Sequence, residues 1–458
     1  MQARGSVDIF DESRPMWRLF LVFLIPLILS NALQSASQTI SSIYLGRLIG
    51  VHALAAVSSI FPVIFLLISF MIGLASGSTV LIGQAFGAKQ THTMKRVAGT
   101  TLSVSFILGL VFSVLGQFYA YPLLHLVGTP TDVIHDAVVY SKVVFLWFPA
   151  FFPYLAYTTF LRGTGDSQTP FYFLIVSTVL NVILTPAFIL GWAGLPHIGI
   201  AGAAIAGYIA NAAAFAAFLI YLEKRRHALR FDMEMLRGMT IDWPLLGKIV
   251  RIGVPAGLQT IMVAFAEIAV ISFVNRYGSD ATAAYGAVNQ IIGYVQFPAI
   301  SIGITASIFG AQSIGAHRQD KLNAVIRSGV FLNYAIGGAI IALCYVFAYP
   351  ILGWFITQPR PLEIAHGLLM ITLWSYLLFG NGAVLGGVMR SSGSVLWPTA
   401  FTIFAIWGIE VPTAYLLMPR LGIDGVWMGY PAAYAVSLAL VFFYYTQFWK
   451  NKTHRRLV

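Results

Sequence analysis

The sequence predicts an all-α polytopic membrane protein, with twelve transmembrane helices in two pseudo-symmetric six-helix bundles around a central cleft. Three observations support this fold class. Of the 458 residues, 58% are hydrophobic and only 9% are charged, with a mean hydropathy of +0.81, whereas about a quarter of an ordinary soluble domain is charged. About twelve apolar stretches recur along the chain, and short sequence patterns repeat at half its length.

The apolar stretches each approach or exceed the ~20 residues that a helix needs to cross a bilayer. They are continuous, whereas the strands of a membrane β-barrel would alternate between apolar and polar residues. The predicted spans are Met16–Tyr44, His52–Ile82, Gly99–Tyr119, Ala137–Phe160, Pro170–Leu190, Ile198–Leu222, Leu246–Asn275, Thr282–Gln312, Ala324–Tyr345, Ile364–Val388, Val395–Met418 and Gly425–Trp449.

Two copies of one unit are indicated by an internal repeat. The segment Leu161–Asp166, with the sequence Leu-Arg-Gly-Thr-Gly-Asp, resembles Met389–Ser394, which lies 228 positions later. The same offset relates Gln84–Ala88 to Gln312–Ala316. Repeats at such a spacing predict parallel six-helix halves related by an axis along the membrane normal.

The longest polar stretch inside the chain, Glu223–Trp243, separates the two halves. We therefore expect a cytoplasmic N-terminal tail (1–15), a first lobe with six spans (16–222), a cytoplasmic linker (223–245), a second lobe with six spans (246–449) and a basic cytoplasmic tail (450–458).

The positions of the basic residues indicate the orientation in the membrane. The formal net charge is +11, and all but five of the 27 lysines and arginines fall on one predicted side. The exceptions are Arg47, Lys142, Arg276, Arg360 and Arg420. Basic residues accumulate on the cytoplasmic side of membrane proteins. We therefore expect a multi-pass protein of the plasma (inner) membrane with both termini cytoplasmic, and no nucleic-acid partner.

Two prolines occupy equivalent places in the two halves, Pro26 in the first span and Pro255 in the seventh. Proline removes a backbone donor and leaves a carbonyl free, so both are candidates for bending the first helix of each half. The alternative is that membrane helices simply contain more proline than soluble helices.

A series of short motifs along the chain resembles one transporter family. The motifs are Pro26 with Ser30-Asn31, Gly46-Arg47-Leu48, Leu54-Ala55-Ala56, Gly87-Ala88, Leu161–Asp166, Asn181 and Leu421–Trp427. In order and spacing they resemble the multidrug and toxic compound extrusion (MATE) family, over essentially the whole chain. The resemblance implies two six-helix lobes and cation-driven export of diverse organic compounds, often cationic or amphiphilic.

The first half departs from that family at two positions. Many bacterial and archaeal members carry an aspartate where this chain has Ser41, and a second aspartate where it has Thr185. Their usual polar neighbours, Gln34 and Asn181, remain. The resemblance therefore implies a polar cavity in the first lobe, formed by Gln34, Ser41, Asn181 and Thr185, that lacks the carboxylates the family often uses for cation coupling.

Only two acidic residues lie well inside predicted spans, Glu267 and Glu410. Acids within membrane segments usually face a cavity and have a function. An acid that is protonated from outside and discharges inward is what a proton-coupled exporter needs, so these are the candidate cation-coupling residues. Other family branches place a functional glutamate near Val263, about one turn before Glu267. The alternative for both residues is a structural hydrogen bond inside a packed bundle.

Aromatic, methionine and amide side chains of the second half are candidates for substrate contact. Aromatic and methionine side chains adapt to varied ligands, and aromatic rings attract cations. The candidates are Met262, Phe265, Asn289, Gln290, Tyr294, Gln296, Phe297, Tyr376 and Asn381. The alternative is packing, with the amides joining neighbouring helices.

We therefore predict a secondary antiporter that exports organic compounds in exchange for H⁺ or Na⁺ by rocking of the two lobes. The alternative is a lipid-linked oligosaccharide flippase of the same superfamily.

We expect no enzymatic activity and no catalytic residues, because no catalytic constellation and no phosphate-binding Gly-x4-Gly-Lys-Ser/Thr loop occur. We expect no cofactor or metal beyond the coupling H⁺ or Na⁺. The expected partners are organic small molecules and the bilayer, and we expect the chain to function as a monomer.

Overall fold

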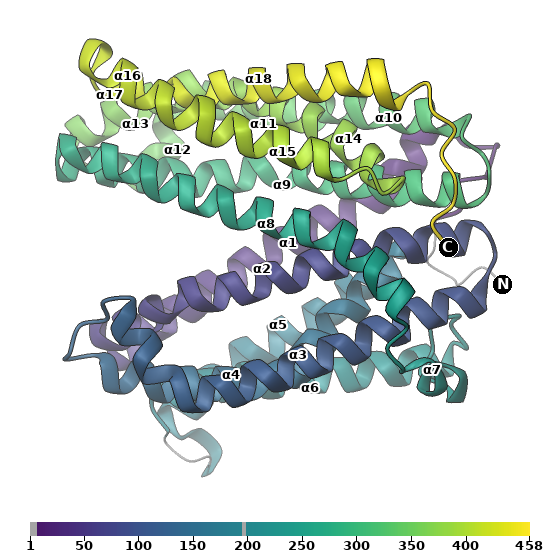
Figure 1. The fold of residues 1–458 in the computed structure, drawn as a ribbon. Coiled ribbons are helices and arrows are strands. Elements are labelled where there is room, and N and C mark those ends of the chain that lie inside the picture. The colour runs from purple at the N-terminus through teal and green to yellow at the C-terminus, as the bar shows by residue number, and fades with distance from the viewer. Residues whose placement is uncertain (1–6, 195–197) are drawn as a thin grey trace. The chain divides into compact units, whose positions relative to one another are not determined.

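The computed structural model describes residues 7–194 and 198–458. Within these residues no strand is present, and twelve helices are long and apolar enough to cross a membrane. They are Met16–Ile49, His52–Gly87, Thr91–Leu126, Ile134–Gly163, Gln168–Leu190, Ile200–Lys224, Trp243–Tyr277, Ser279–Gly315, Lys321–Val346, Pro359–Ser391, Leu396–Leu421 and Ile423–Trp449. Each of the twelve predicted spans overlaps one of these helices, which confirms the all-α class (Figure 1).

The chain divides into two compact units. Of the described residues, unit 1 contains Leu29–Phe86 and Gln90–Gly253. Its helices are the second part of α1 (Met16–Tyr44), the π-helical turn η1 (Leu45–Ile49), α2 (Val51–Gly87), α3 (Thr91–Leu126), α4 (Ile134–Gly163), α5 (Gln168–Leu190), the short turn η2 (Trp192–Gly194), α6 (Ile200–Lys224), α7 (Met233–Gly238) and the start of α8 (Trp243–Val274).

Within unit 1, α3 packs along α4 and α5 packs along α6, and the short α7 lies beside α3 (Figure 1). Glycine allows close approaches between these helices. A Cβ atom on Gly109 of α3 would lie 2.6 Å from the carbonyl oxygen of Phe148 in α4. Membrane helices associate through such small residues, because lipid provides no hydrophobic force between helices.

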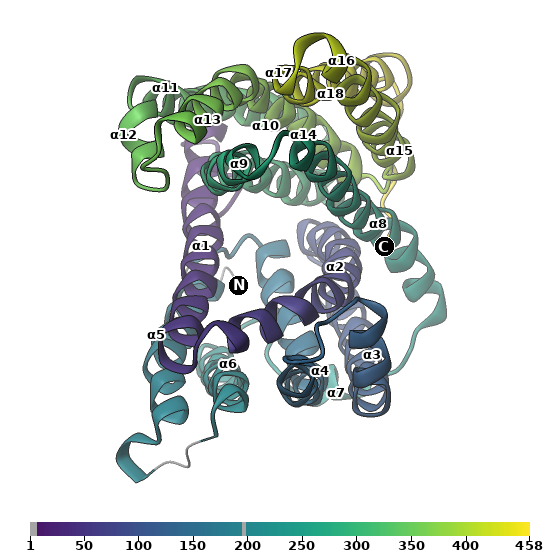
Figure 2. The same cartoon turned by 90° about the vertical axis from the view of Figure 1, so that its left-hand side faces the viewer.

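Unit 2 contains Val7–Ile28, Gly87–Lys89 and Val254–Val458. Its helices are the first part of α1, the rest of α8, η3 (Asn275–Tyr277), α9 (Ser279–Gly315), α10 (Lys321–Leu332), η4 (Asn333–Gly337), α11 (Gly338–Val346), α12 (Ala348–Gly353), α13 (Pro359–Thr372), η5 (Leu373–Ser375), α14 (Tyr376–Ser391), α15 (Leu396–Phe404), η6 (Ala405–Glu410), α16 (Val411–Leu421), α17 (Ile423–Trp427), α18 (Gly429–Tyr444) and η7 (Tyr445–Trp449). Helix α14 packs against α9 and α18 (Figure 2). The π-helical segment η6 packs against α15, α16 and α18.

The first helix of each half is divided between the units. The boundary falls after Ile28 in α1 and after Gly253 in α8, close to Pro26 and Pro255, and both helices continue through their prolines. The compact units therefore differ from the predicted lobes 16–222 and 246–449 at these two helices. Aromatic packing explains the division in α1, because the ring of Phe20 lies 5.4 Å from that of Phe309 in unit 2.

The predicted linker is an integral part of unit 1. The buried Lys95 ammonium group of α3 binds the carboxylates of Asp232 at 2.7 Å and Glu234 at 2.6 Å. Asp232 also caps α7 by accepting a hydrogen bond from the Met235 backbone N–H at 3.0 Å. Further along the linker, Arg96 of α3 pairs with Asp242. These bonds fix both ends of α7 to the start of α3.

The segment that follows the last helix of each half folds back over the same turn of its own unit. In unit 1, the hydroxyl of Tyr157 donates to the carbonyl oxygen of Leu229, and the buried His227 interacts electrostatically with Asp166 of the repeated turn. In unit 2, the Leu457 side chain lies against Gly393 of the equivalent turn. The duplication thus extends to two straps, residues 225–232 and 450–458, which were predicted only as a linker and a tail.

Candidate cation-coupling site

Glu410 is the last residue of the π-helical segment η6 and is buried, with 5% of its surface exposed. A π-helical turn widens the helix locally and often occurs at functional sites. The neighbouring α18 closes over it at Gly429. A Cβ atom at that position would lie 2.8 Å from the carbonyl oxygen of Glu410 and 3.4 Å from its Cγ. The carboxyl group is therefore enclosed by unit 2 itself.

Tyrosine side chains from three helices interact electrostatically with this carboxyl group. The hydroxyls of Tyr285 in α9 and Tyr430 in α18 lie 2.9 Å apart and share a hydrogen bond. The Tyr285 ring stacks on the fully buried Trp427, with centroids 5.8 Å apart and planes 7° from parallel. The stacking fixes the phenol ring, so the Tyr285 hydroxyl is held toward Tyr430.

A second tyrosine pair completes the surroundings. The rings of Tyr376 in α14 and Tyr434 in α18 meet edge to face, with centroids 5.2 Å apart. Glu410 interacts electrostatically with Tyr376, Tyr434, Tyr285 and Tyr430. Four phenol groups therefore share the environment of one buried carboxyl group. Phenols can donate hydrogen bonds to a carboxylate and present π faces to a cation.

Glu267 of α8 is the second predicted acid. Its side chain is accessible, and its carboxyl group interacts electrostatically with that of Glu410. The structure thus brings the two candidates into one region of unit 2, although 143 positions separate them in the sequence. No ion pair to either acid is formed within residues 7–194 and 198–458.

The chemistry of this arrangement follows from the lack of a basic partner. An uncompensated carboxylate in an apolar interior costs several kcal/mol. Glu410 must therefore either carry a proton or be paired with a cation from outside the protein. No group of three or more His, Cys, Asp or Glu side chains that could hold a metal ion occurs in the described part of the chain. The site offers two carboxyl groups and a ring of phenols to a proton, a monovalent cation or an organic cation.

The predicted substrate-contact residues take several positions. Tyr376 belongs to the tyrosine cluster, and the Asn289 side chain interacts with Tyr285. The carbonyl oxygen of Met262 accepts a hydrogen bond of 3.3 Å from the Trp407 indole N–H, which links α8 to η6. These three residues lie on or next to the cluster around Glu410.

Asn381 instead joins helices. Its amide oxygen accepts a hydrogen bond of 3.0 Å from Asn333, and its amide nitrogen donates one of 2.9 Å to the Tyr334 hydroxyl. This favours the packing alternative for Asn381. The remaining candidates lie on α8 or α9: Phe265, Gln290 and Tyr294 are exposed, and Gln296 and Phe297 are partly buried.

In unit 1, the four residues of the predicted polar cavity lie on two helices, α1 and α5. The Thr185 hydroxyl donates to the Asn181 side-chain oxygen at 2.8 Å, one turn away on α5. Gln34 is exposed and Ser41 is partly buried on α1, and no hydrogen bond in the described chain joins either to that pair. Thr185 therefore gives Asn181 a hydrogen bond within α5. The resemblance implies that many other members have an aspartate at the position of Thr185.

Four residues of the cluster were not predicted: Tyr285, Trp427, Tyr430 and Tyr434. A signal for part of it is present in the sequence, because Tyr430 and Tyr434 are four residues apart and face the same side of a helix. Trp427 ends the motif Leu421–Trp427, one of the motifs that resemble the MATE family.

Comparison with known proteins identifies the family. The MatE family model matches this chain twice, over residues 26–187 and 255–416. The two matches begin at Pro26 and Pro255, as expected for equivalent positions of two repeats. The probable multidrug resistance protein YoeA of Bacillus subtilis (strain 168) is 55% identical over 98% of this chain and 97% of its own length. The multidrug export protein MepA of Staphylococcus aureus (strain MRSA252) is 25% identical, with 91% of this chain and 90% of that protein covered.

Solved structures show the same fold. The MATE transporter VcmN of Vibrio cholerae in its bent form matches with a TM-score of 0.85 at 20% identity, over 94% of this chain and 96% of that chain. The outward-facing conformation of a multidrug resistance MATE family transporter matches with a TM-score of 0.84 at 21% identity, over 94% of this chain and 95% of that one. The two matches to the family model and the similarity to YoeA show that the chain belongs to the MATE family of membrane transporters.

Proposed function

We propose that this chain is a secondary active antiporter that exports organic compounds in exchange for H⁺ or Na⁺, with Glu410 as the residue that binds the coupling ion. The observation that carries the proposal is the buried carboxyl group of Glu410, surrounded by phenols and without a basic partner. The multidrug names of the relatives YoeA and MepA support export of organic compounds over the flippase alternative.

Exchange follows from competition for one carboxyl group. A proton or Na⁺ neutralises Glu410, and an organic cation held against the tyrosine rings does the same. Binding of one therefore weakens binding of the other. Glu267, exposed and electrostatically coupled to Glu410, is placed to receive the ion first. Rocking of the two units would give the site access to one side of the membrane at a time.

The orientation belongs to the same proposal. We place the protein in the plasma (inner) membrane with both termini cytoplasmic, because basic residues concentrate on the side of the linker and of the C-terminal tail. The linker alone contributes Lys224, Arg225, Arg226, Arg230 and Arg237. In this orientation, the coupling ion enters from outside and is released to the cytoplasm.

The test is efflux of a fluorescent organic cation in inverted membrane vesicles, with pH and Na⁺ gradients imposed separately. Glu410→Gln should reduce gradient-driven transport to the level of vesicles without the protein, because a neutral amide cannot exchange a proton for a cation. Glu267→Gln should slow transport, with a smaller effect. Glu363→Gln is the matched control, since Glu363 is an exposed carboxyl group of unit 2 on α13, outside the cluster.

Two outcomes would contradict the proposal. If the Glu267→Gln, Glu410→Gln double variant transports as well as the unaltered protein, neither residue is needed for coupling. Transport by the unaltered protein that depends on neither gradient would remove the antiporter mechanism itself.

A further inference from the structure

The linker carries large apolar side chains that face away from the protein. Phe231, Met233, Leu236 and Trp243 are 40%, 64%, 44% and 71% exposed, respectively. They lie in a segment that connects the end of the sixth membrane span to the start of the seventh, which also contains the basic residues Arg230 and Arg237 and the acids Asp232, Glu234 and Asp242. Exposed apolar groups combined with basic ones are typical of segments that lie in the interface of a bilayer, and tryptophan is enriched there.

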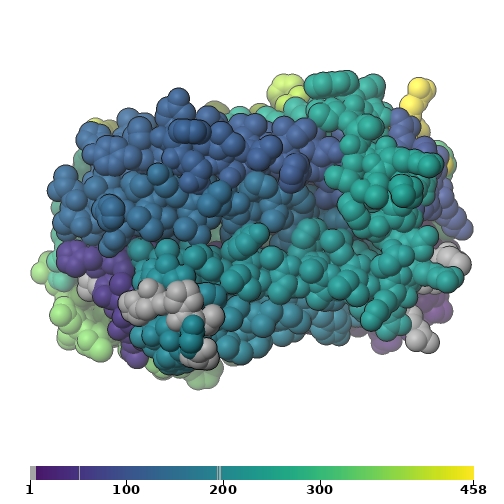
Figure 3. Space-filling model, turned by 90° about the horizontal axis from the view of Figure 1, so that it is seen from below, coloured from purple at the N-terminus to yellow at the C-terminus, as the bar shows by residue number. Residues whose placement is uncertain are grey.

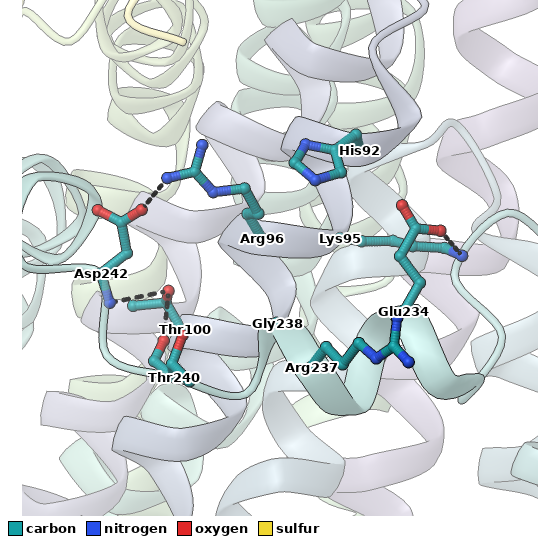
Figure 4. A pocket seen from close by; sticks show the side chains of 9 residues that line it. All are labelled: His92, Lys95, Arg96, Thr100, Glu234, Arg237, Gly238, Thr240 and Asp242. Atoms are coloured by element: carbon teal, nitrogen blue, oxygen red, sulfur yellow. Dashed lines mark hydrogen bonds and ion pairs between the residues drawn. The ribbon is translucent and has the colours of Figure 1, made fainter.

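A pocket of about 460 Å³ lies between this linker and the start of α3, entirely within unit 1. Its charged lining consists of His92, Lys95 and Arg96 from α3, and of Glu234, Arg237 and Asp242 from the linker (Figure 4). In the space-filling view, the teal surface of the linker and the start of α8 lies beside the blue surface of the first half (Figure 3).

The charges in this pocket leave an excess of positive charge. Glu234 is bound by Lys95 and Asp242 is bound by Arg96. Arg237 forms no ion pair with any described residue. Figure 4 shows Arg237 on α7 and His92 on α3 at opposite sides of the pocket. The site therefore presents one unpaired guanidinium group and one imidazole ring to a ligand.

The walls of the pocket are held together before any ligand binds. The Thr100 hydroxyl of α3 donates to the carbonyl oxygen of Thr240 at 3.2 Å. Gly99 packs directly on Gly238, where a Cβ atom would overlap the linker backbone. The ion pairs of the buried Lys95 with Asp232 and Glu234 hold the same two elements together. A fixed pocket with unpaired basic groups binds an anion without first paying the cost of ordering its walls.

We propose that this pocket binds the headgroup of an anionic phospholipid from the leaflet on which the linker lies. The guanidinium group of Arg237 binds the lipid phosphate, with His92 as a second donor. The exposed apolar side chains enter the acyl region beside it, which places the headgroup at the depth of the pocket. Basic residues next to membrane spans attract anionic lipids in this way. The proposal is independent of the transport mechanism.

The experiment measures binding of phosphatidylglycerol to the purified full-length protein in detergent, by native mass spectrometry and by the lipid-induced rise in melting temperature. The unaltered protein should retain phosphatidylglycerol in preference to phosphatidylcholine. Arg237→Gln should weaken that binding about fivefold, the contribution of one basic residue near an anionic surface, and Arg237→Gln with His92→Gln should weaken it further. Lys224→Gln is the matched control, since it removes an exposed linker cation outside the pocket.

Separate arms distinguish the lipid from other sources of phosphate. Inorganic phosphate and glycerol phosphate at the same concentration should not raise the melting temperature, because they lack the acyl chains that the apolar side chains contact. Equal stabilisation by these salts would overturn the assignment to a lipid. Equal binding of both phospholipids, or binding by the Arg237→Gln, His92→Gln double variant as tight as that of the unaltered protein, would show that this pocket is not the lipid site. The melting temperature of each variant without added lipid shows whether it is folded.

Discussion

The backbone of Gly429 lies directly on Glu410, so that a Cβ atom on the glycine would be 2.8 Å from the carbonyl oxygen and 3.4 Å from the Cγ of the glutamate. This contact closes the carboxyl group inside unit 2. The proposed coupling site therefore depends on Gly429 as well as on Glu410. Whether the site tolerates a side chain at position 429 can be tested directly.

Gly429→Ala should destabilise the protein by about 1–3 kcal/mol, the usual cost of overpacking, and should impair gradient-driven efflux because α18 must move away from Glu410. The measurements are the melting temperature in detergent and vesicle efflux. Gly386→Ala, in α14 of the same unit, is the matched control, because an added Cβ there has no neighbour within 4 Å. Equal effects of the two substitutions would contradict the role given to this contact.

The hydrogen bond between Tyr285 and Tyr430 predicts a non-additive pair of substitutions. Each single Tyr→Phe change leaves the partner hydroxyl of the 2.9 Å pair buried without that bond, whereas the double change removes both hydroxyls. The coupling free energy should therefore be about 1 kcal/mol, measured as a double-mutant cycle of melting in detergent. Tyr172→Phe, an exposed tyrosine of α5, controls for loss of a hydroxyl group. Additive effects of the two substitutions would show that the hydroxyls are independent.

A second close contact joins Asn333 of η4 to Gly380 of α14. The space of a Gly380 Cβ is already occupied by the Asn333 amide, which donates to the Leu377 carbonyl oxygen at 2.9 Å. Gly380→Ala should destabilise the protein by roughly 1–3 kcal/mol or more, since the buried amide cannot move without losing its hydrogen bonds.

The same contact predicts a rescue. Asn333→Ala removes the obstructing amide, so adding it to Gly380→Ala should restore part of the lost melting temperature. Gly382→Ala is the control, because an added Cβ there meets nothing within 4 Å. If the double variant melts no higher than Gly380→Ala alone, the clash with Asn333 is not the cause of the destabilisation.

Asp232 predicts how attachment of the linker depends on pH. Burial opposes ionisation, but hydrogen bonds from Lys95, the Met235 N–H and Arg230 outweigh it and lower the pKa of Asp232 to about 2. The folded pKa lies below the ordinary value of 3.8, so the ionised carboxylate stabilises the fold above about pH 4. This contribution should be lost as the pH falls from about 4 to about 2.

Asp232→Asn should therefore loosen the linker at pH 7, seen as faster trypsin cleavage at Arg230 and Arg237. By hydrogen exchange, the difference between the variant and the unaltered protein should shrink as the pH falls toward 2. Glu234→Gln is the control for removing a partner of Lys95 without removing the helix cap. A difference that persists unchanged at pH 2 would contradict the assignment to ionised Asp232.

The fold was largely predictable from the sequence because the membrane restricts the choice of structure. An apolar stretch of membrane length must form a helix, and the repeated turns at Arg162 and Arg390 align the two halves. The division of α1 and α8 between the units was not predictable in this way. It depends on side-chain packing over long sequence separations, such as that of Phe20 on Phe309.

The candidate site was predictable only through its acids. Glu267 and Glu410 stand out because carboxyl groups are rare in membrane spans, whereas a tyrosine there is unremarkable. Which tyrosines surround Glu410 depends on how α9, α14 and α18 pack, and a single sequence contains no measure of that. The polar residues of the first half differ in the same respect. Asn181 and Thr185 are one turn apart on a single helix, so the sequence alone brings them together, whereas Gln34 and Ser41 lie on another helix.

The strap of unit 1 predicts a second pH dependence, at His227. Burial lowers the pKa of His227 below its usual value of 6.5, against the opposing charge of Asp166. The Nδ1 atom accepts a hydrogen bond of 3.1 Å from the Leu229 N–H, so the neutral ring is the form that the strap uses. This stabilisation is present above about pH 6.5 and is lost as the pH falls through the lowered pKa.

Hydrogen exchange of the Leu229 amide should therefore show less protection, relative to intrinsic exchange rates, at pH 5 than at pH 7.5. His227→Gln should abolish the pH dependence, while His92→Gln, an exposed histidine of the same unit, should leave it unchanged. Equal protection at both pH values in the unaltered protein would show that protonation of His227 does not open the strap.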